Sequence, residues 1–422
     1  MAVNSHFPSD DVDVAVIGAG AAGVAAGHRL AEAGVNFVIL EARSRIGGRA
    51  WTETVEGMPI DLGCGWLHSG DRNPWTKIAE AAGLTVDRTP APWTSRRDLS
   101  MSEAARGEFE TAAEQFNRRV AAAADRGRDG PAAEYLERGG KWNGLIDAIS
   151  TYANGAELDR ISVIDWQHYD DDNVNWRVVE GYGTAISNYG TGLPVVLDCA
   201  VTQIDHSGPK IRIETSHGVV TATAAIVTLP TTMIANEAVR FIPALPEKLS
   251  AAAGLPLGLA DKVLLAIDRA EDLPPETRLF GQTDRTATGA YHLRPFGRPV
   301  IEGFFGGRLA RELEEEGEGA FVRFAIDELA AHFGSGIRSR LRPLVESSWH
   351  SDPFARGSYS HALPGKAGSR AALAKPVDER IFFSGEACSL ESFSTAHGAY
   401  ETGAAAAASV LKSRALDSQR SK

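Results

Sequence analysis

Near the start of the chain, apolar and polar positions follow the pattern of a strand, a helix and a second strand. Val14 to Ile17 is an unbroken apolar run, which is typical of a buried parallel strand. The alanine-rich segment 21–33 predicts a helix that stops at Gly34. Phe37 to Leu40 is again apolar and predicts the next strand. This order is typical of a parallel α/β sheet.

The remaining pattern alternates between blocks of helix and blocks of strand. Helices are expected at 100–124, from Pro131 onward, and at 142–152, 321–333 and 394–411. Four short strands are expected to form a small sheet of their own, at 195–197, 201–204, 211–214 and 219–222. Separate core strands are expected at 224–229, 261–267, 300–305, 344–349 and 380–387. We therefore predict an α/β fold whose first domain is interrupted and later resumed.

A glycine-rich turn between the first strand and helix gives this unit its candidate chemistry. Gly18, Gly20 and Gly23 have the G-x-G-x-x-G spacing that lets backbone approach a pyrophosphate at a helix N-terminus. Glu41 follows Gly18 by 23 positions, where a dinucleotide fold places an acid on the ribose hydroxyls. That acid disfavours a 2′-phosphate and hence NADP. Glycine-rich turns also occur in other α/β proteins, so the turn alone leaves that alternative open.

Composition narrows the class of protein further. A net charge of −12 over 422 residues argues against nucleic acid or an anionic membrane as partner, and weakly favours a cationic substrate. Three scattered cysteines, Cys64, Cys199 and Cys388, have neither metal spacing nor a disulfide pattern. The start of the chain has no leader pattern, and no apolar run is long enough to span a membrane. We expect a cytoplasmic protein, monomeric or homodimeric, without a metal.

The segment after Glu41 distinguishes between nucleotide cofactors. Its sequence, EARSRIGGR over residues 41–49, combines arginines that suit phosphate oxygens with a glycine pair that permits close approach. By residue type alone, these arginines could also belong to a solvated turn. The stretch resembles the E-A-R-x-R-x-G-G-R signature of the flavin amine oxidase superfamily. The resemblance implies FAD, a Rossmann-like FAD domain and an interleaved sheet-plus-helix substrate domain.

Further signatures later in the chain are similar to those of polyamine oxidases and flavin-type histone lysine demethylases. They are Trp66-Leu67-His68, Asp261-Lys262-Val263, Trp349 with Gly357 to Ser360, and Ser384-Gly385-Glu386 with Thr395 to Tyr400. The resemblance makes Lys262 the lysine that binds a water beside flavin N5, and His68 an active-site histidine. It makes Tyr359 one wall of an amine-binding aromatic cage, and Trp349 a neighbour of the isoalloxazine.

Each of these residues also has an ordinary structural interpretation. Lys262 could be an edge lysine whose stem packs while its amine reaches solvent. His68 could be a hydrogen-bonded polar residue, and Tyr359 and Trp349 could be core aromatics. The resemblance further implies cofactor contacts at Gly18, Gly20, Ala22, Gly23, Glu41, Ala42, Arg43, Gly48, Arg49, Gly65, Trp66, Val201, Gly385, Glu386, Thr395 and Ala396.

Two positions depart from the animal monoamine oxidases of this superfamily. Ser358 stands where those enzymes attach flavin through a cysteine, so we expect non-covalent FAD. Thr395 stands where they have a second cage tyrosine, which leaves room for a bulkier or secondary amine. The tower insertion and chromatin-binding domains of the demethylases are absent from the sequence, so we do not expect a histone substrate.

These features together predict an FAD-dependent oxidase that converts an amine to an imine and reduces O₂ to H₂O₂. Its substrate is expected to be a polyamine or another bulky or secondary amine. The alternatives are an oxidase of L-amino acids or N-heterocycles, for which Arg294, Arg298 and Arg308 are candidate carboxylate ligands, and a non-catalytic FAD-binding module. The FAD domain is expected at 1–84, 178–240 and 345–422, and the substrate domain at 85–177 and 241–344.

Overall fold

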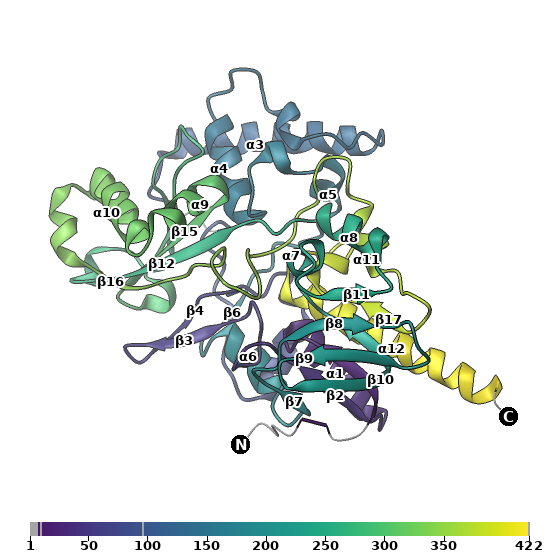
Figure 1. The fold of residues 1–422 in the computed structure, drawn as a ribbon. Coiled ribbons are helices and arrows are strands. Elements are labelled where there is room, and N and C mark those ends of the chain that lie inside the picture. Colours follow the sequence, from purple (N-terminus) through teal and green to yellow (C-terminus); the bar gives the residue numbers. More distant parts are fainter. Residues whose placement is uncertain (1–6, 9–10, 95–96, 421–422) are drawn as a thin grey trace.

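The computed structural model describes residues 7–8, 11–94 and 97–420, and in Figure 1 these form two lobes that meet along one side. One lobe is built on a sheet that contains β1 and β10, and the other on a sheet that contains β12 and β15. Residues 1–6, to which the expectation of no leader segment refers, lie outside the described residues.

The first lobe contains an eight-stranded sheet whose central strand, β1, was expected from the apolar run at its core. β1 pairs in parallel with both β2 and β10, and β17 adds to β10 in parallel. Across the sheet the order is β11 (Arg240–Ile242), β8 (Val201–Asp205), β9 (Ile211–Thr215), β10 (Gly218–Val227), β1 (Val12–Ile17), β2 (Phe37–Leu40) and β7 (Val195–Val196), with β17 (Ile381–Phe383) beside β10.

The expectation of a separate small sheet is wrong. The strands β8 and β9 belong to the main sheet, and the two strands expected at 219–222 and 224–229 are one strand, β10. The first half of β10 pairs antiparallel with β9 and alternates between buried and exposed residues. Its last four residues, 224–227, pair in parallel with β1 and are all buried. The change in pattern therefore marks a change of partner and not a break in the strand.

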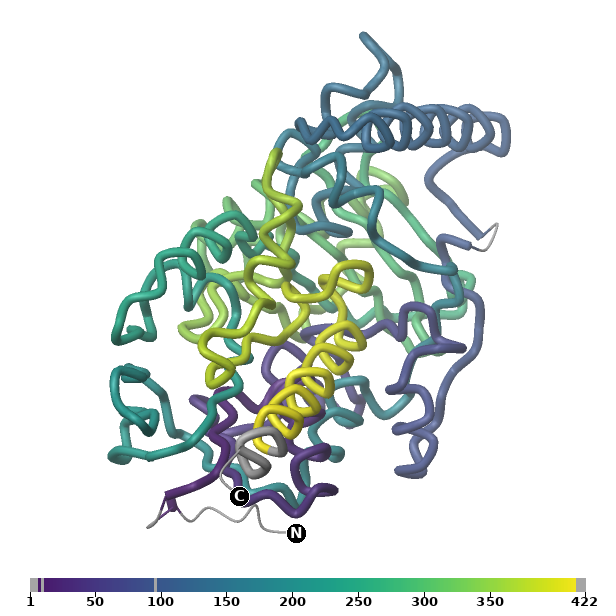
Figure 2. Tube along the Cα trace, turned by 90° about the vertical axis from the view of Figure 1, so that its right-hand side faces the viewer, coloured from purple at the N-terminus to yellow at the C-terminus, as the bar shows by residue number. Residues whose placement is uncertain are grey.

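Two alanine-rich helices from opposite ends of the chain pack against each other on this sheet. They are α1 (Ala21–Glu32) and α12 (Ala396–Arg420), and Figure 2 shows α12 beside the purple N-terminal segment. A side chain at Gly403 would place its Cβ 2.1 Å from the carbonyl oxygen of Ala22, so the helices are in backbone contact there. Small residues allow this approach.

The second lobe contains a five-stranded antiparallel sheet. The strand order is β13 (Thr277–Phe280), β14 (Ala290–Leu293), β15 (Val300–Gly306), β12 (Ala260–Ile267) and β16 (Leu341–Glu346). Leu265, Ile301 and Phe305 lie in one core with residues of α9 (Gly307–Glu316) and α10 (Ala320–Phe333). Neighbouring positions such as Lys262 and Glu302 point to the opposite face, because side chains alternate along a strand. The strand expected at 344–349 begins and ends three residues earlier.

Helices between the two expected parts of the first domain cover the second lobe. The helices expected at 100–124 and 142–152 are α3 (Glu103–Ala124) and α4 (Asn143–Ala153). Pro131 does not begin a longer helix, because the chain after it makes only the 3₁₀ turn η1 (Ala132–Tyr135) and becomes extended at Leu136. Gly139 and Gly140 follow and disfavour further helix.

The remaining elements connect the two lobes or cover their edges. The paired strands are β3 (Thr52–Val55) with β4 (Met58–Asp61), and β5 (Val86–Asp87) with β6 (Arg177–Val178). The short helices are α2 (Pro74–Ala81), α5 (Val163–His168), α6 (Tyr182–Tyr189), α7 (Thr231–Ala235), α8 (Pro246–Ala253) and α11 (Ser369–Ala374). The other 3₁₀ turns are η2 (Leu158–Arg160), η3 (Ala270–Asp272), η4 (Pro295–Gly297), η5 (Ser335–Arg340) and η6 (Glu386–Cys388).

Two properties of the fold concern membranes and metals. Among the described residues, no helix combines the length and apolar character needed to cross a bilayer. The same part of the chain has no group of three or more His, Cys, Asp or Glu side chains placed to bind a metal ion.

The exact domain boundaries stay a prediction.

Candidate functional site

Two glycine-rich segments lie face to face at the N-terminus of α1. Gly18 has φ +103°, and a Cβ at Gly23 would lie 1.9 Å from the Gly18 carbonyl oxygen. Gly20 pairs with Gly47 in an isolated parallel bridge, and a Cβ at Gly48 would lie 3.2 Å from Gly20 Cα. Gly20 is the N-cap of α1 and supplies no side-chain cap. The first-turn N–H groups of Ala21 to Gly23 therefore suit a diphosphate.

Glu41 lies beside this turn at the end of β2. Its carboxylate accepts hydrogen bonds from the backbone N–H of Ala19 at 2.7 Å and of Arg43 at 2.8 Å. Burial raises the pKa of Glu41, although these two N–H groups and the charge of Arg43 oppose that effect. The N–H of Cys199 donates to the Glu41 carbonyl at 2.8 Å, which brings the segment before Val201 to the same place. This arrangement suits a ribose.

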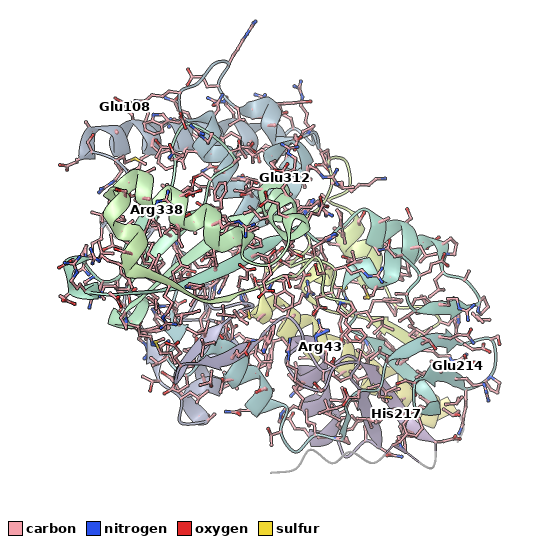
Figure 3. All side chains as sticks on the ribbon, turned by 60° about the vertical axis from the view of Figure 1, so that its left-hand side comes forward. Arg43, Glu108, Glu214, His217, Glu312 and Arg338 are labelled. Carbon is pink, nitrogen blue, oxygen red and sulfur yellow. The ribbon has the colours of Figure 1, made fainter. Side chains whose placement is uncertain are left out.

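Arg43 and Arg49 contact segments that lie about 300 residues away in the sequence. Arg43, labelled in Figure 3, makes a 2.7 Å ion pair with Asp352, and its Nε is buried without a partner. Arg49 donates to the Glu386 carboxylate at 2.8 Å and to the Ser358 carbonyl at 2.9 Å. These arginines therefore join the second glycine-rich segment to the returning C-terminal part of the chain.

Glu386 has a full set of hydrogen-bond partners. It accepts from the Ser360 hydroxyl at 2.6 Å and from the Ser394 N–H at 3.1 Å, in addition to Arg49. Burial opposes ionisation, but the charge of Arg49 and the Ser360 hydroxyl outweigh it and lower the pKa of Glu386. Sequence reasoning named Glu386 as a site residue but gave Ser360 only as the end of a signature, because nothing in the sequence indicates that its hydroxyl meets Glu386.

A cavity next to Glu386 has in its lining a polar side-chain atom without a protein partner. It is lined by residues that include Arg49, Leu229, Ser384 and Gly385. The Ser384 hydroxyl is buried and makes no hydrogen bond in the structure, and Gly385 has φ +130°. The orphaned atoms of Ser384 and Arg43 and the side-chain-free contact between the two glycine-rich segments fit FAD.

Lys262 lies on β12, at the junction between the two lobes. Its Nζ donates to the Asp61 carbonyl at 2.7 Å and lies 3.1 Å from the Glu302 carboxylate. A Cβ at Gly65 would lie 3.3 Å from this Nζ, and the Phe304 ring is centred 5.3 Å away. The Lys262 side chain is only 11% exposed, so the ordinary interpretation of an edge lysine reaching solvent is wrong.

Two neighbours of Lys262 were missed by the sequence analysis. Glu302 is the only acid in the apolar run that forms β15, and such an isolated acid could have been singled out from the pattern. Asp61 contacts Lys262 through its carbonyl, which no side-chain pattern could indicate. Its carboxylate instead accepts from the Thr52 hydroxyl and from the N–H groups of Tyr182 and Gly183, at the start of α6. Burial raises the pKa of Asp61 despite the nearby Lys262 charge.

Trp349 lies in the same region as Lys262. It is buried, and its indole N–H donates to the Leu62 carbonyl at 3.0 Å, just before the turn that contains Gly65. Its backbone N–H donates at 3.0 Å to Asp261, the residue before Lys262. These bonds hold Trp349 between the two lobes. This position is compatible with both interpretations of Trp349, a neighbour of the isoalloxazine and a core aromatic.

Tyr359 is partly buried, and its phenol donates to the Tyr152 carbonyl in α4. Burial raises the pKa of this phenol, which therefore stays neutral at ordinary pH. Ser358 directs its hydroxyl at Ala260, accepting from the N–H and donating to the carbonyl, both at 2.8 Å. Hydrogen bonds thus join the segment 358–359 to β12 and to α4.

The two remaining candidate substrate-binding residues, Thr395 and His68, form hydrogen bonds with other parts of the protein. The Thr395 hydroxyl donates to the Ser392 carbonyl at 2.6 Å and accepts from the Gly398 N–H at 3.0 Å, which is an N-cap arrangement for α12. His68 Nδ1 is 2.6 Å from the Asn175 amide oxygen and 3.4 Å from the Asp171 carboxylate. No contact is recorded between either side chain and Lys262 within the described part of the chain.

Trp66 has an aromatic and cationic environment that the sequence did not indicate. Its ring meets Trp93 edge-on at 4.4 Å, and the Arg177 guanidinium lies 4.9 Å from its centroid. The His292 ring stacks at 6.2 Å. Gly65 and Trp66 therefore place one turn between Lys262 on one side and an aromatic cluster on the other. The assignment of the cofactor contacts, Ala22, Ala42, Val201 and Ala396 among them, and of the substrate-binding residues stays a prediction.

Comparisons of the whole chain with known proteins agree with this geometry. The family model for flavin containing amine oxidoreductases matches residues 21–173 and 157–411. Polyamine oxidase 4 of Oryza sativa subsp. japonica is 30% identical over 437 residues, which cover 93% of this chain and 87% of that protein. Lysine-specific histone demethylase 1 homolog 3 of the same plant is 27% identical, but the match covers only 55% of its length.

Solved structures agree on the fold. A structure of putrescine oxidase bound to putrescine has a TM-score of 0.77 at 19% identity, covering 96% of this chain and all of that one (100%). Cyclohexylamine oxidase from Brevibacterium oxydans IH-35A also has a TM-score of 0.77, at 21% identity and with 96% and 99% coverage. The two-domain α/β fold is thus confirmed. The chain belongs to the family of flavin containing amine oxidoreductases and is an FAD-dependent enzyme that oxidises amines.

Proposed function

We propose that this amine oxidase acts on a polyamine or another bulky or secondary amine, with O₂ as electron acceptor and H₂O₂ as product. The observation that carries the proposal is the position of Thr395. Its hydroxyl is used to cap α12, and the chain has this threonine where the family resemblance places a second cage ring. A site walled by an aromatic ring on one side only accepts a wider amine than a closed cage does. The names of the plant relatives, which are polyamine oxidases, support the same substrate class.

FAD, when bound, accepts two electrons from the amine and passes them to oxygen. The chain contributes binding and orientation: the N-terminus of α1 and Glu41 would hold the diphosphate and the ribose, and Arg49 and Glu386 would hold another part of the cofactor. The neutral Tyr359 ring provides an electron-rich face for the amine. Lys262 Nζ has three N–H donors and uses two on Asp61 and Glu302, so one remains for a water.

The amino-acid oxidase alternative needs a cation that is available to a substrate carboxylate. Arg298 donates to the carbonyls of Pro59 and Val179 at 2.8 and 2.9 Å, and Arg294 donates to the carbonyl of Leu273 at 2.8 Å. Arg308 pairs with Glu157 and Asp159 and is 62% exposed. Because these three arginines are engaged elsewhere, the geometry favours an amine without a carboxylate.

An oxygen-uptake screen tests the substrate class directly. Purified enzyme is supplied with triamines, tetramines, secondary amines, small monoamines, L-amino acids and cyclic amines, and peroxide is measured in parallel. We expect the highest kcat/KM with polyamines or bulky secondary amines, and one H₂O₂ per O₂ consumed. A clear preference for L-amino acids or small monoamines would overturn the proposal.

The mode of FAD attachment follows from Ser358. Its hydroxyl is bonded to both backbone groups of Ala260, and a serine offers no thiol for a thioether bond to flavin. We therefore expect acid precipitation to release all of the yellow flavin into the supernatant. Flavin that stays with the pellet would contradict non-covalent binding.

A further inference from the structure

The ammonium of Lys262 lies between one carbonyl and one carboxylate. The Asp61 carbonyl comes from the end of β4, and the Glu302 carboxylate comes from β15, the strand next to β12. In this antiparallel pair Lys262 is opposite Phe304, so Glu302 is the next residue along β15 on the same face. The Glu302 side chain is 15% exposed and that of Lys262 is 11% exposed.

Other charged groups near Lys262 are engaged elsewhere. The Asp61 carboxylate bonds to Thr52 and to the start of α6, and Arg49 bonds to Glu386 and the Ser358 carbonyl. Arg298 donates to two backbone carbonyls. Burial, followed by the Asp61 charge, raises the pKa of the Cys64 thiol to about 12, so this thiol is neutral. Within the described residues, Glu302 is the one acid paired with the Lys262 ammonium.

We propose that Glu302 is a positioning residue that fixes the direction of the Lys262 ammonium and compensates its charge. An ammonium has three donors and a flexible four-carbon stem, so its direction is set by its partners. With Asp61 and Glu302 occupying two donors, the third points to a defined place. Without Glu302, the stem is free to rotate about a single remaining bond. The inference rests on the proposed role of Lys262, and it assigns to Glu302 no contact with substrate or cofactor.

The test is a double-mutant cycle on the full-length holoenzyme, with Glu302→Gln, Lys262→Met and the double variant. Stopped-flow absorbance measures flavin reduction by amine and reoxidation by O₂. We expect Lys262→Met to slow at least one half-reaction. Glu302→Gln should slow the same half-reaction by roughly 10- to 100-fold, the range for a lost charge-assisted hydrogen bond. In the Lys262→Met background the Glu302→Gln change should have almost no further effect, because the two residues act as one unit.

A second readout does not depend on activity. In the wild type, Glu302→Gln removes an ion-pair partner and should lower the melting temperature of the holoenzyme. In Lys262→Met, the carboxylate is a partly buried charge without its cation, so Glu302→Gln should raise the melting temperature. This reversal of sign is not expected from a residue that merely packs. Glu302→Asp should restore part of both properties, since the charge is kept but the reach is shorter.

The matched control is Glu346→Gln on β16 of the same sheet. Glu346 accepts a backbone N–H from Gly319 at 2.8 Å, and a glutamine oxygen can do the same. Its half-reaction rates should match the wild type. If Lys262→Met is slow but Glu302→Gln is normal, or if their effects simply add, the positioning role is overturned and the proposed function stands. If Lys262→Met itself has wild-type rates, Lys262 has no role in either half-reaction, and the positioning role of Glu302 is overturned with it.

Discussion

Glu41 illustrates how a single side chain orders the backbone around a ligand site. One of its carboxylate oxygens accepts from the N–H of Ala19, inside the glycine-rich turn, and the other accepts from the N–H of Arg43, two residues after Glu41. Both bonds are intramolecular and do not require a nucleotide, so the turn is already shaped in the protein itself. A carboxylate has about four acceptor sites, which leaves room for ribose hydroxyls as well. Glu41 therefore serves the local fold and the expected cofactor together.

Two substitutions separate these functions. Glu41→Ala removes both backbone bonds and any ribose bond, and should weaken FAD binding by on the order of 1.5–3 kcal/mol. Glu41→Gln keeps one acceptor oxygen and should lose less. Fluorescence titration of the apoenzyme with FAD gives the affinities, and far-UV circular dichroism checks the fold. An unchanged dissociation constant in Glu41→Ala would show that Glu41 does not bind the ribose.

Because Thr395 caps α12, its substitution is expected to change the stability of the protein as well as its substrate preference. Thr395→Tyr should narrow the site and reduce kcat/KM for bulky amines more than for small ones. It also removes the hydroxyl that accepts from Gly398, which should cost about 1 kcal/mol of stability. Thr395→Ala removes the cap without adding a ring and is the matched control. If both variants slow all amines equally, the effect comes from the cap and Thr395 does not shape the substrate site.

At the residue level, sequence reasoning reached the side chains that carry a motif and missed their partners. Glu41 and Lys262 could be named because their spacing or context is specific. The Asp61 carbonyl could not be, since backbone groups have no sequence signal. Glu302 lies 40 positions after Lys262, and only the antiparallel pairing of β12 and β15 brings the two together.

Among the elements, the short strands β6 and β14 are joined by a buried ionic cluster. Arg177 in β6 makes ion pairs with Asp87 at 2.7 Å and with Glu276 at 2.9 Å. Glu276 in turn lies 2.8 Å from the ring nitrogen of His292 in β14. Trp66 packs against both Arg177 and His292, so this cluster supports the turn beside Lys262.

This cluster predicts an acid-sensitive contribution to stability. Burial acts to raise the pKa of Glu276, but the His292 and Arg177 interactions outweigh it and lower the pKa to about 2. The unfolded value is about 4.3, so the stabilisation is present above pH 4.3 and is lost as the pH falls toward 2. Glu276→Gln should therefore cost on the order of 2–3 kcal/mol at pH 6, and about half of that near pH 3.

Urea unfolding of the holoenzyme at several pH values measures this difference. Glu108→Gln is the control, because Glu108 forms an exposed pair with Lys141 and should contribute little at any pH. A Glu276→Gln cost that is the same at pH 6 and pH 3 would show that packing, and not ionisation, explains the effect.

Element boundaries were predictable where one environment extends along the whole element. The strand β2 was expected at its observed residues because all four are buried, and α1 was expected within one residue because it lies between Gly20 and Gly34. The strand β10 was split in two because its burial changes where its partner changes from β9 to β1. The four-residue strands β13 and β14 were not expected, since runs of that length have no distinctive period.

For the whole molecule, the site is formed where the two lobes meet. Arg49, Trp349 and Lys262 each bond to a segment of the other lobe or to a distant part of the chain. The sequence indicated an interrupted first domain, but it could not indicate which faces meet, because that depends on tertiary packing. The family resemblance implied two interleaved domains, and the comparisons confirm the two-domain fold.

The net charge of −12 leads to a prediction about substrate capture. Acidic side chains occur on separate parts of the exterior, as Glu108 and Glu312 illustrate in Figure 3. Near His68, the Asp170 and Asp172 side chains are 52% and 30% exposed and share the single cation Arg72. A protein with this charge attracts a polycation over several ångströms, and dissolved salt screens the attraction over a Debye length of about 10 Å at 0.1 M.

We therefore expect kcat/KM for a triamine to fall several-fold between about 0.02 and 0.5 M NaCl, and kcat to change little. A monoamine substrate carries one charge and should show a much shallower dependence in the same buffers. Steady-state oxygen uptake with both amines at constant pH and viscosity makes the comparison. Equal salt dependence for the two amines would mean that salt acts on the enzyme itself. It would also remove electrostatic attraction as a reason for preferring polyamines, whatever the aromatic wall at Tyr359 contributes.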